Sequence, residues 1–192
     1  MAIKYDMTVL ARLIGITRQK YFLTRDKGEM AYDLLKQQLE ATPEGQALVL
    51  VFPPDQLVDS SFADESAVRL GEEILNGIHG EKCILFEKLT DDSVKNFEGV
   101  LSLRGIKMPL LRVEERGGWN IMGNLEESLL KTLKLVHRRE YLTASDLALQ
   151  LKMAVNTAST RLKRLHNLHL VRREHEISEA GLQYLYYFWE WN

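Results

Sequence analysis

The chain has 192 residues, of which 45% are hydrophobic and 27% are charged, and its formal net charge is −2. This length allows one sizeable hydrophobic core or two small ones, and the composition is that of an ordinary soluble globular protein. The charge gives no overall basic signature for nucleic acid, but it is unevenly divided. Residues 1–124 hold 15 basic and 19 acidic side chains, whereas residues 125–192 hold 10 and 8. We therefore expect an acidic domain joined to a slightly basic one.

The single cysteine excludes a disulfide framework or a cysteine metal cluster within one chain, and Cys83 lies in an apolar run. The N-terminus lacks a basic segment followed by an apolar one. The longest apolar stretch, residues 47–52, ends at two prolines and is too short to cross a bilayer. We expect a cytoplasmic protein that does not enter the membrane.

The first half of the chain predicts alternating strands and helices. Apolar runs predict strands at residues 7–15, 21–23, 46–52, 83–86 and 108–113, and helical spacing predicts helices at 26–41, 62–78 and 90–103. The run at 46–52 is apolar throughout, which is typical of a strand buried on both faces of a mainly parallel sheet. The alternation predicts an α/β fold with right-handed crossovers.

Residues 114–124 form a polar, glycine-containing segment that is the best candidate boundary between two domains. Trp119 and Ile121 within it could instead form a last short strand docked on the first domain. We place the first domain at residues 1–118 and the second at residues 124–192.

Three helices are predicted in the second domain. The first should begin at Asn124, which has an acid three positions later, and the second at Thr143, which is followed by Asp146 in the same pattern. The third should begin at Asn156. It carries Ala158, Leu162 and Leu165 on one face and Thr157, Thr160, Lys163 and Arg164 away from it. A tight turn between the second and third helices gives a helix-turn-helix pattern, whose last helix enters the DNA major groove.

Four motifs in this half carry a family resemblance. They are LTASDLA at 142–148, NTASTRLKRL at 156–165, LVRR at 170–173 and ISEAG at 177–181. In this order and spacing they resemble bacterial winged-helix transcription regulators, over about residues 125–188. His169 departs from the family, which usually has glycine there because the helix end favours a left-handed residue. We therefore expect that turn to be built differently.

The resemblance implies a DNA-binding surface on the third helix and the wing. Its residues would be Thr157, Thr160, Arg161, Lys163 and Arg164 on the helix, and Arg172, Arg173 and His175 in the wing. Arginine can bind guanine or clamp a phosphate, and threonine offers a hydroxyl or a methyl group. We expect a short wing with residues 174–176 between its strands, where two acids would meet phosphates unfavourably. Alternatively, the basic residues form a solvated face of a domain used for dimerisation or protein contact.

Six aromatic residues crowd the end of the chain, too many for a lone surface helix. They are Tyr184, Tyr186, Tyr187, Phe188, Trp189 and Trp191. They could dock on the winged-helix core or form a homodimer seam rich in aromatic anchors. Both uses fit the sequence.

Three motifs in the first half carry a second resemblance. They are FLTR at 22–25 followed by Gly28, VLVF at 49–52 and LVDSSFADE at 57–65. They resemble the STAS-like domain family of unknown function, relatives of the anti-sigma factor antagonists, over about residues 7–115. The resemblance implies a sheet of about four strands with helices, used for protein partnering and signal sensing.

The triplet Asp59-Ser60-Ser61 matches a motif of the antagonists in which a partner kinase phosphorylates a serine at a helix start. The resemblance therefore implies Ser61, or Ser60, as a phosphorylation site. A phosphate on Ser61 would be favoured by the helix N-terminus but opposed by Asp59, Asp64 and Glu65. Alternatively, Ser61 and Asp64 form a capping box with a structural role alone.

The sequence contains no Gly-rich phosphate loop, dinucleotide fingerprint, zinc-binding helix motif or serine nucleophile elbow. We therefore expect no enzyme, no cofactor and no metal site. The function that we expect is a DNA-binding transcriptional regulator. It would bind double-stranded DNA as a homodimer, with an α/β domain that senses a ligand or protein partner. The alternative is a protein-interaction adaptor or phospho-switch of the anti-sigma factor antagonist type without DNA binding.

Overall fold

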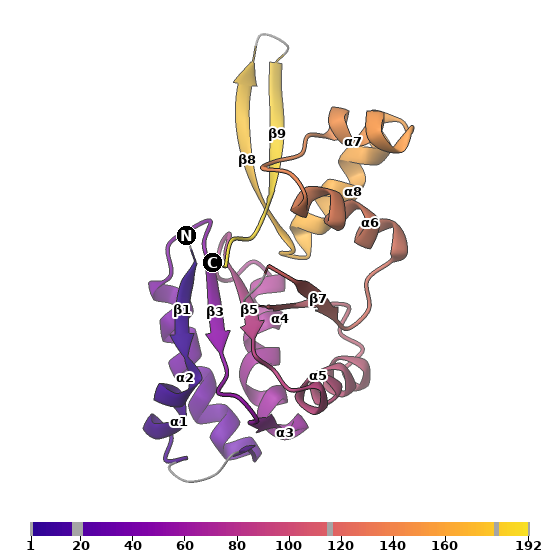
Figure 1. The fold of residues 1–192 in the computed structure, drawn as a ribbon. Coiled ribbons are helices and arrows are strands. Elements are labelled where there is room, and N and C mark those ends of the chain that lie inside the picture. Colours follow the sequence, from indigo (N-terminus) through magenta and orange to yellow (C-terminus); the bar gives the residue numbers. More distant parts are fainter. Residues whose placement is uncertain (1, 17–20, 115–116, 179–180, 192) are drawn as a thin grey trace. The chain divides into compact units, whose positions relative to one another are not determined.

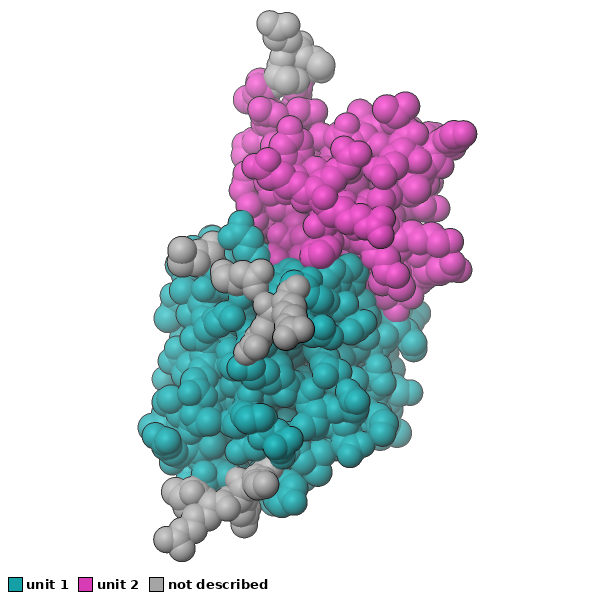
Figure 2. Space-filling model, viewed as in Figure 1, with its two compact units in different colours: residues 1–124, 190–192 teal, residues 125–189 magenta. Residues whose placement is uncertain are grey.

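The computed structural model describes residues 2–16, 21–114, 117–178 and 181–191. The chain forms two compact units (Figure 2), one of residues 1–124 with 190–192, which we call unit 1, and one of residues 125–189, which we call unit 2. The chain therefore passes twice from one unit to the other. Two of the predicted boundaries change: residues 119–124 and the end of the chain belong to the first unit.

Unit 1 is built around a five-stranded mixed sheet (Figure 1). Its strands lie in the order β1 (Ile3–Asp6), β3 (Ala47–Val51), β5 (Cys83–Glu87), β6 (Leu110–Val113) and β7 (Trp119–Met122). The first four are parallel, and β7 runs antiparallel to β6. Four of the five β3 residues are buried, as predicted for a strand covered on both faces. The pairing of β7 with β6 explains why the first unit extends beyond residue 118.

Helices connect the strands of this sheet. They are α1 (Met7–Leu13), α2 (Arg25–Ala41), α3 (Ser60–Ala63), the π-helical turn η1 (Asp64–Val68), α4 (Arg69–Leu75) and α5 (Asp91–Leu103). The α/β class and the helices predicted at 26–41, 62–78 and 90–103 are confirmed.

The strand predicted at residues 7–15 is wrong, because this segment forms α1. Met7, Leu10 and Ile14 are buried at helical spacing, and Asp6 caps the helix by accepting a hydrogen bond from the Thr8 backbone N at 2.8 Å.

A second, two-stranded parallel sheet pairs β2 (Tyr21–Phe22) with β4 (Leu57–Val58). Strand β2 leads into α2, and β4 leads into α3. Because the two strands are parallel and adjacent, the N-termini of the two helices lie side by side. Asp59 joins them: its backbone N donates to the Phe22 carbonyl at 2.9 Å, and its carboxylate accepts from the Thr24 backbone N at 3.2 Å.

A chain of aromatic rings runs through the core of unit 1. Phe22 contacts Phe52 and Phe62, with ring centroids 5.8 and 5.1 Å apart. Phe86 in turn contacts Phe52 and Phe97, at 6.5 and 5.1 Å. All five rings are buried, and aromatic pairs at such separations are favourable. The chain of rings fixes the start of α3 to the main sheet and to α5.

Unit 2 consists of three helices followed by an antiparallel hairpin (Figure 1). The elements are α6 (Glu127–His137), α7 (Ala144–Leu151), α8 (Val155–Asn167), β8 (Val171–Ser178) and β9 (Gly181–Phe188). The capping box predicted for Thr143 and Asp146 is confirmed. The cap predicted at Asn124 is wrong, because α6 begins after Glu126, which makes no side-chain cap.

The hairpin is longer than predicted. Residues 174–176 were expected between its strands, but they lie inside β8 and pair with residues 183–185 of β9. Aromatic side chains favour strands, and the crowded segment 182–188 forms β9. Glu179 and Ala180 of the predicted ISEAG motif, like residues 115–116 of the predicted boundary, lie outside the described residues.

Helix α8 ends in the left-handed turn that glycine favours, although the residue is His169, with φ 50°. The Leu170 backbone N donates to the Leu165 carbonyl at 3.1 Å, and the His169 N donates to the His166 carbonyl at 2.9 Å. These are the two hydrogen bonds of a Schellman motif. The expectation of a differently built turn is therefore wrong. Trp189 holds this turn from the end of β9, because its Nε1 donates to the His169 carbonyl at 2.9 Å.

Candidate functional site

Helix α8 presents one face to the core of unit 2 and another to solvent. Ala158, Leu162 and Leu165 are fully buried, as predicted. Between Val155 and Asn167 the helix carries three arginine or lysine side chains and no aspartate or glutamate. Its exposed face is therefore positively charged, with no carboxylate of its own.

The predicted DNA-contacting residues are not equally placed on this helix. Thr157, Thr160 and Lys163 are exposed, and Arg161 is half-buried beside them. The Thr160 hydroxyl donates to the Asn156 carbonyl at 2.9 Å, which occupies its hydrogen. Lys163 and Arg161 are thus the cations best placed to meet an approaching phosphate.

Arg164, also predicted to face DNA, is engaged by a carboxylate within unit 2. Its Nη1 donates to Glu126 Oε2 at 3.0 Å, and its Nη2 donates to the other oxygen of the same carboxylate. This bidentate hydrogen bonding lowers the pKa of Glu126 and raises that of Arg164. The pair ties the start of α6 to α8. Sequence reasoning missed it, because the partners are 38 positions apart.

The hairpin separates the two arginines predicted for the wing. Arg172 and Arg173 are successive strand residues, so their side chains point to opposite faces of the hairpin. The Arg172 guanidinium lies 4.0 Å from the centre of the Tyr187 ring and also pairs with Glu174. The Arg173 guanidinium lies 4.4 Å from the Tyr184 ring centre. Cation–π contacts therefore hold both arginines against the hairpin. His175, the third residue predicted for the wing, is exposed.

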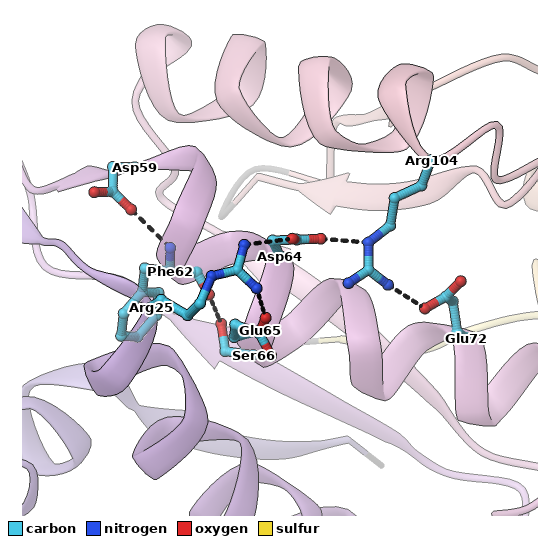
Figure 3. Close-up of polar contacts among 8 residues, drawn as sticks. All are labelled: Arg25, Asp59, Phe62, Asp64, Glu65, Ser66, Glu72 and Arg104. Carbon is cyan, nitrogen blue, oxygen red and sulfur yellow. Dashed lines mark hydrogen bonds and ion pairs between the residues drawn. The ribbon is translucent and has the colours of Figure 1, made fainter.

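Figure 3 shows the start of α3, which holds the predicted phosphorylation site. Asp59 is the N-cap, and its carboxylate accepts from the Phe62 backbone N at 2.7 Å. The capping box predicted for Ser61 and Asp64 is therefore wrong. Ser60 and Ser61 occupy the first turn and are exposed.

The carboxylates expected to oppose a phosphate are paired with arginines (Figure 3). Arg104 Nε lies 2.5 Å from one Asp64 oxygen, and Arg25 Nη2 lies 3.4 Å from the other. Arg25 also pairs with Glu65, and Arg104 Nη1 lies 2.6 Å from Glu72. The result is a row of alternating charges on the surface. Sequence reasoning missed both arginines, which lie 39 and 40 positions from Asp64 and have no motif linking them to it.

Two backbone distortions adjoin this row. Thr24 has φ 76° and ψ 147°, a conformation that is strained for a β-branched residue. The turn from Asp64 to Val68 is π-helical, a feature frequent at functional sites. Gly28 lets α2 approach closely, since a Cβ there would lie 3.0 Å from the Phe62 carbonyl oxygen. The junction of α2 and α3 is thus a candidate functional region of unit 1.

Among the described residues, no group of three or more His, Cys, Asp and Glu side chains is arranged to hold a metal ion. None of the helices in the described part of the chain has the length and apolarity needed to cross a bilayer. No protein-family model matches the sequence, and a search of curated proteins found no similar one.

Proposed function

We propose that the protein is a DNA-binding transcriptional regulator whose unit 2 is a winged helix-turn-helix domain. The observation that carries the proposal is the exposed face of α8, whose own residues include cations and threonines but no aspartate or glutamate. The order of elements supports it: only residues 152–154 separate α7 from α8, and an antiparallel hairpin follows. In such domains the second helix of the pair lies in the major groove.

Each polar residue of α8 has a role in this proposal. Thr157 lies in the first turn, where recognition helices contact base edges. Lys163 and Arg161 bind phosphates or guanine. Arg164 positions α8 through Glu126, and the hairpin adds Arg172 or Arg173 as a phosphate contact.

Unit 1 is, in this proposal, a STAS-like domain that senses a ligand or protein partner in the cytoplasm. Support comes from the positions of the residues that carry the resemblance to STAS-like domains. Thr24, Arg25 and Gly28 lie at the start of α2, and Asp59 and Asp64 lie at the starts of α3 and η1. A hydrogen bond, an ion pair and a close backbone approach join the two helix starts. A partner bound there would meet a strained, highly charged surface.

The test is fluorescence anisotropy with a random-sequence DNA duplex at several salt concentrations. We expect binding that weakens steeply with salt, and an Arg161→Ala, Lys163→Ala variant with affinity lower by about ten-fold or more. Its salt slope should fall by about one for each phosphate that the variant no longer neutralises. Lys95→Ala removes an exposed lysine from α5 and is the control. Undetectable binding at low salt, or binding that the α8 variant leaves unchanged, would contradict the proposal.

The exposed Ser60 and Ser61 favour a second candidate, a phospho-switch of the anti-sigma factor antagonist type. Asp59 performs the capping that Ser61 was expected to perform, and Arg25 and Arg104 offset the negative charge of Asp64. Peptide mass spectrometry on protein purified from its native cells tests this candidate. A phosphate on the peptide that contains both serines is expected, and its absence under all growth conditions would argue against the switch.

A further inference from the structure

Strand β8 leaves one of its edges open. It runs for eight residues and pairs with β9 along the other edge. Within the described ranges no strand of the chain pairs with the open edge (Figure 1). A long open edge is a ready template for another strand, and natural proteins usually cover or shorten such edges or place charged side chains along them.

We propose that this edge pairs antiparallel with the same strand of a second copy, giving a homodimer whose two-fold axis passes through Glu174. The dimer would contain a continuous four-stranded sheet in the order β9-β8-β8-β9. The proposal does not depend on DNA binding. If the protein also binds DNA, the symmetric dimer calls for a palindromic operator.

In this arrangement, charged residues of one β8 strand face residues of opposite charge on the β8 strand of the second copy. Arg172 and Glu176 share one face of the strand and lie symmetrically on either side of Glu174. Pairing about Glu174 therefore places Arg172 opposite Glu176 of the second copy, and the symmetry repeats this contact. Opposite charges facing each other across strands are stabilising.

The apolar side chains match in the same register. Ile177 and Leu182 face each other across the hairpin and are 82% and 60% exposed. Val171 and Phe188 face each other at its base and are buried. The proposed pairing sets Ile177 beside Val171 of the second copy. One apolar row then crosses all four strands. The side chain that gains an apolar neighbour at the new seam is the exposed Ile177, because Val171 is already buried in its own unit.

Other symmetric registers are poorer. An axis at Arg173 would place that arginine opposite its own copy, and an axis at His175 would place Glu174 opposite Glu176. The axis at Glu174 brings one pair of like charges together. Each of these carboxylates, however, already pairs with Arg172 of its own chain.

Charge reversal tests the pairing. Sedimentation without DNA should show a wild-type dimer at micromolar concentration. Arg172→Glu and Glu176→Arg should each weaken dimerisation by about ten-fold or more, because like charges then face each other twice. An equimolar mixture of the two variants should dimerise again, since every reversed position now faces an opposite charge. Mixing cannot repair a folding defect, so recovery identifies the contact.

A cross-link provides an independent test of register. Opposite residues of antiparallel strands have Cα atoms about 4.5–5.5 Å apart, within the range of a disulfide. Glu174→Cys should therefore give a covalent dimer on mild oxidation. Gln183→Cys, on the same face of β9, should not, and the native Cys83 is buried. A monomeric wild type, a mixture that stays monomeric, or equal cross-linking of the control would overturn the proposal, and none of these results would contradict DNA binding itself.

Discussion

Glu73 lies at the centre of a polar cluster between α2 and α4. It accepts a hydrogen bond from the Tyr32 hydroxyl, and Oε2 lies 2.8 Å from His79 Nε2 and 3.2 Å from Lys36 Nζ. Burial alone would raise the pKa of Glu73. Hydrogen bonds from Tyr32, His79 and Lys36 outweigh burial and lower the pKa from 4.5 to about 2. The ionised carboxylate therefore stabilises the folded state above pH 4.5, and this stabilisation is lost as the pH falls towards 2.

We expect Glu73→Gln to lower the free energy of unfolding at pH 7 by about 1–2 kcal/mol, allowing for solvent screening of a carboxylate that is 20% exposed. The difference from wild type should shrink between pH 4.5 and 2, where the wild type loses its charge. Urea unfolding at pH 7, 4 and 3 measures it. Glu29→Gln, on the exposed face of α2, is the control. A deficit that stays constant with pH would show that the charge of Glu73 is not the cause.

At the scale of single residues, the sequence predicts which side chains are exposed better than it predicts which side chains form ion pairs. The exposure of Lys163 follows from helical spacing alone. The pairing of Arg164 with Glu126, and of Asp64 with Arg25 and Arg104, depends on which helices become neighbours. Ser61 shows a local limit, because Asp59 competes for the same cap only two positions earlier. Both residue types are good caps, so which of the two caps α3 depends on where the chain leaves β4.

The turn after α8 shows how an element can end at an unfavourable residue. His169 adopts φ 50°, where the Cβ of a non-glycine residue is crowded. We expect His169→Gly to be more stable than His169→Ala by about 1 kcal/mol, because both remove the imidazole and only alanine keeps the crowded Cβ. Thermal unfolding of the two variants measures the difference. Equal stability would show that the left-handed turn is not strained.

At the scale of elements, most of the fold could be predicted from the spacing of apolar residues. The alternating elements of unit 1 and the three helices of unit 2 follow from it. The strand predicted at residues 7–15 rests on their richness in Val, Leu and Ile, but the buried positions repeat with a helical period and the segment forms α1. The length of the hairpin was missed, because a charged stretch such as residues 174–176 is typical of loops. Only pairing with the aromatic strand β9 makes it part of a ladder.

At the scale of the whole molecule, the two units correspond to the two differently charged parts of the sequence: unit 1 is acidic and unit 2 is slightly basic. The sequence could not predict that the chain returns to unit 1 after β9. Neighbouring tryptophans end up in different units. Trp189 donates to the His169 carbonyl within unit 2, whereas Trp191 Nε1 donates to the Glu114 carbonyl in unit 1 at 3.2 Å. Trp191 is therefore part of the packing of unit 1.

Replacing each tryptophan separately tests this assignment. Both side chains are buried, at 2% and 5% exposure, and truncating a buried tryptophan to alanine costs about 3–5 kcal/mol in a well-packed site. Trp191→Ala should therefore increase amide hydrogen exchange chiefly in β6 and β7, because Glu114 directly follows β6. Trp189→Ala should increase it chiefly at the end of α8 and in the hairpin, and each variant serves as the control for the other. If Trp191→Ala left exchange in residues 110–122 unchanged, the end of the chain would not be part of unit 1, and its boundary would return to Asn124.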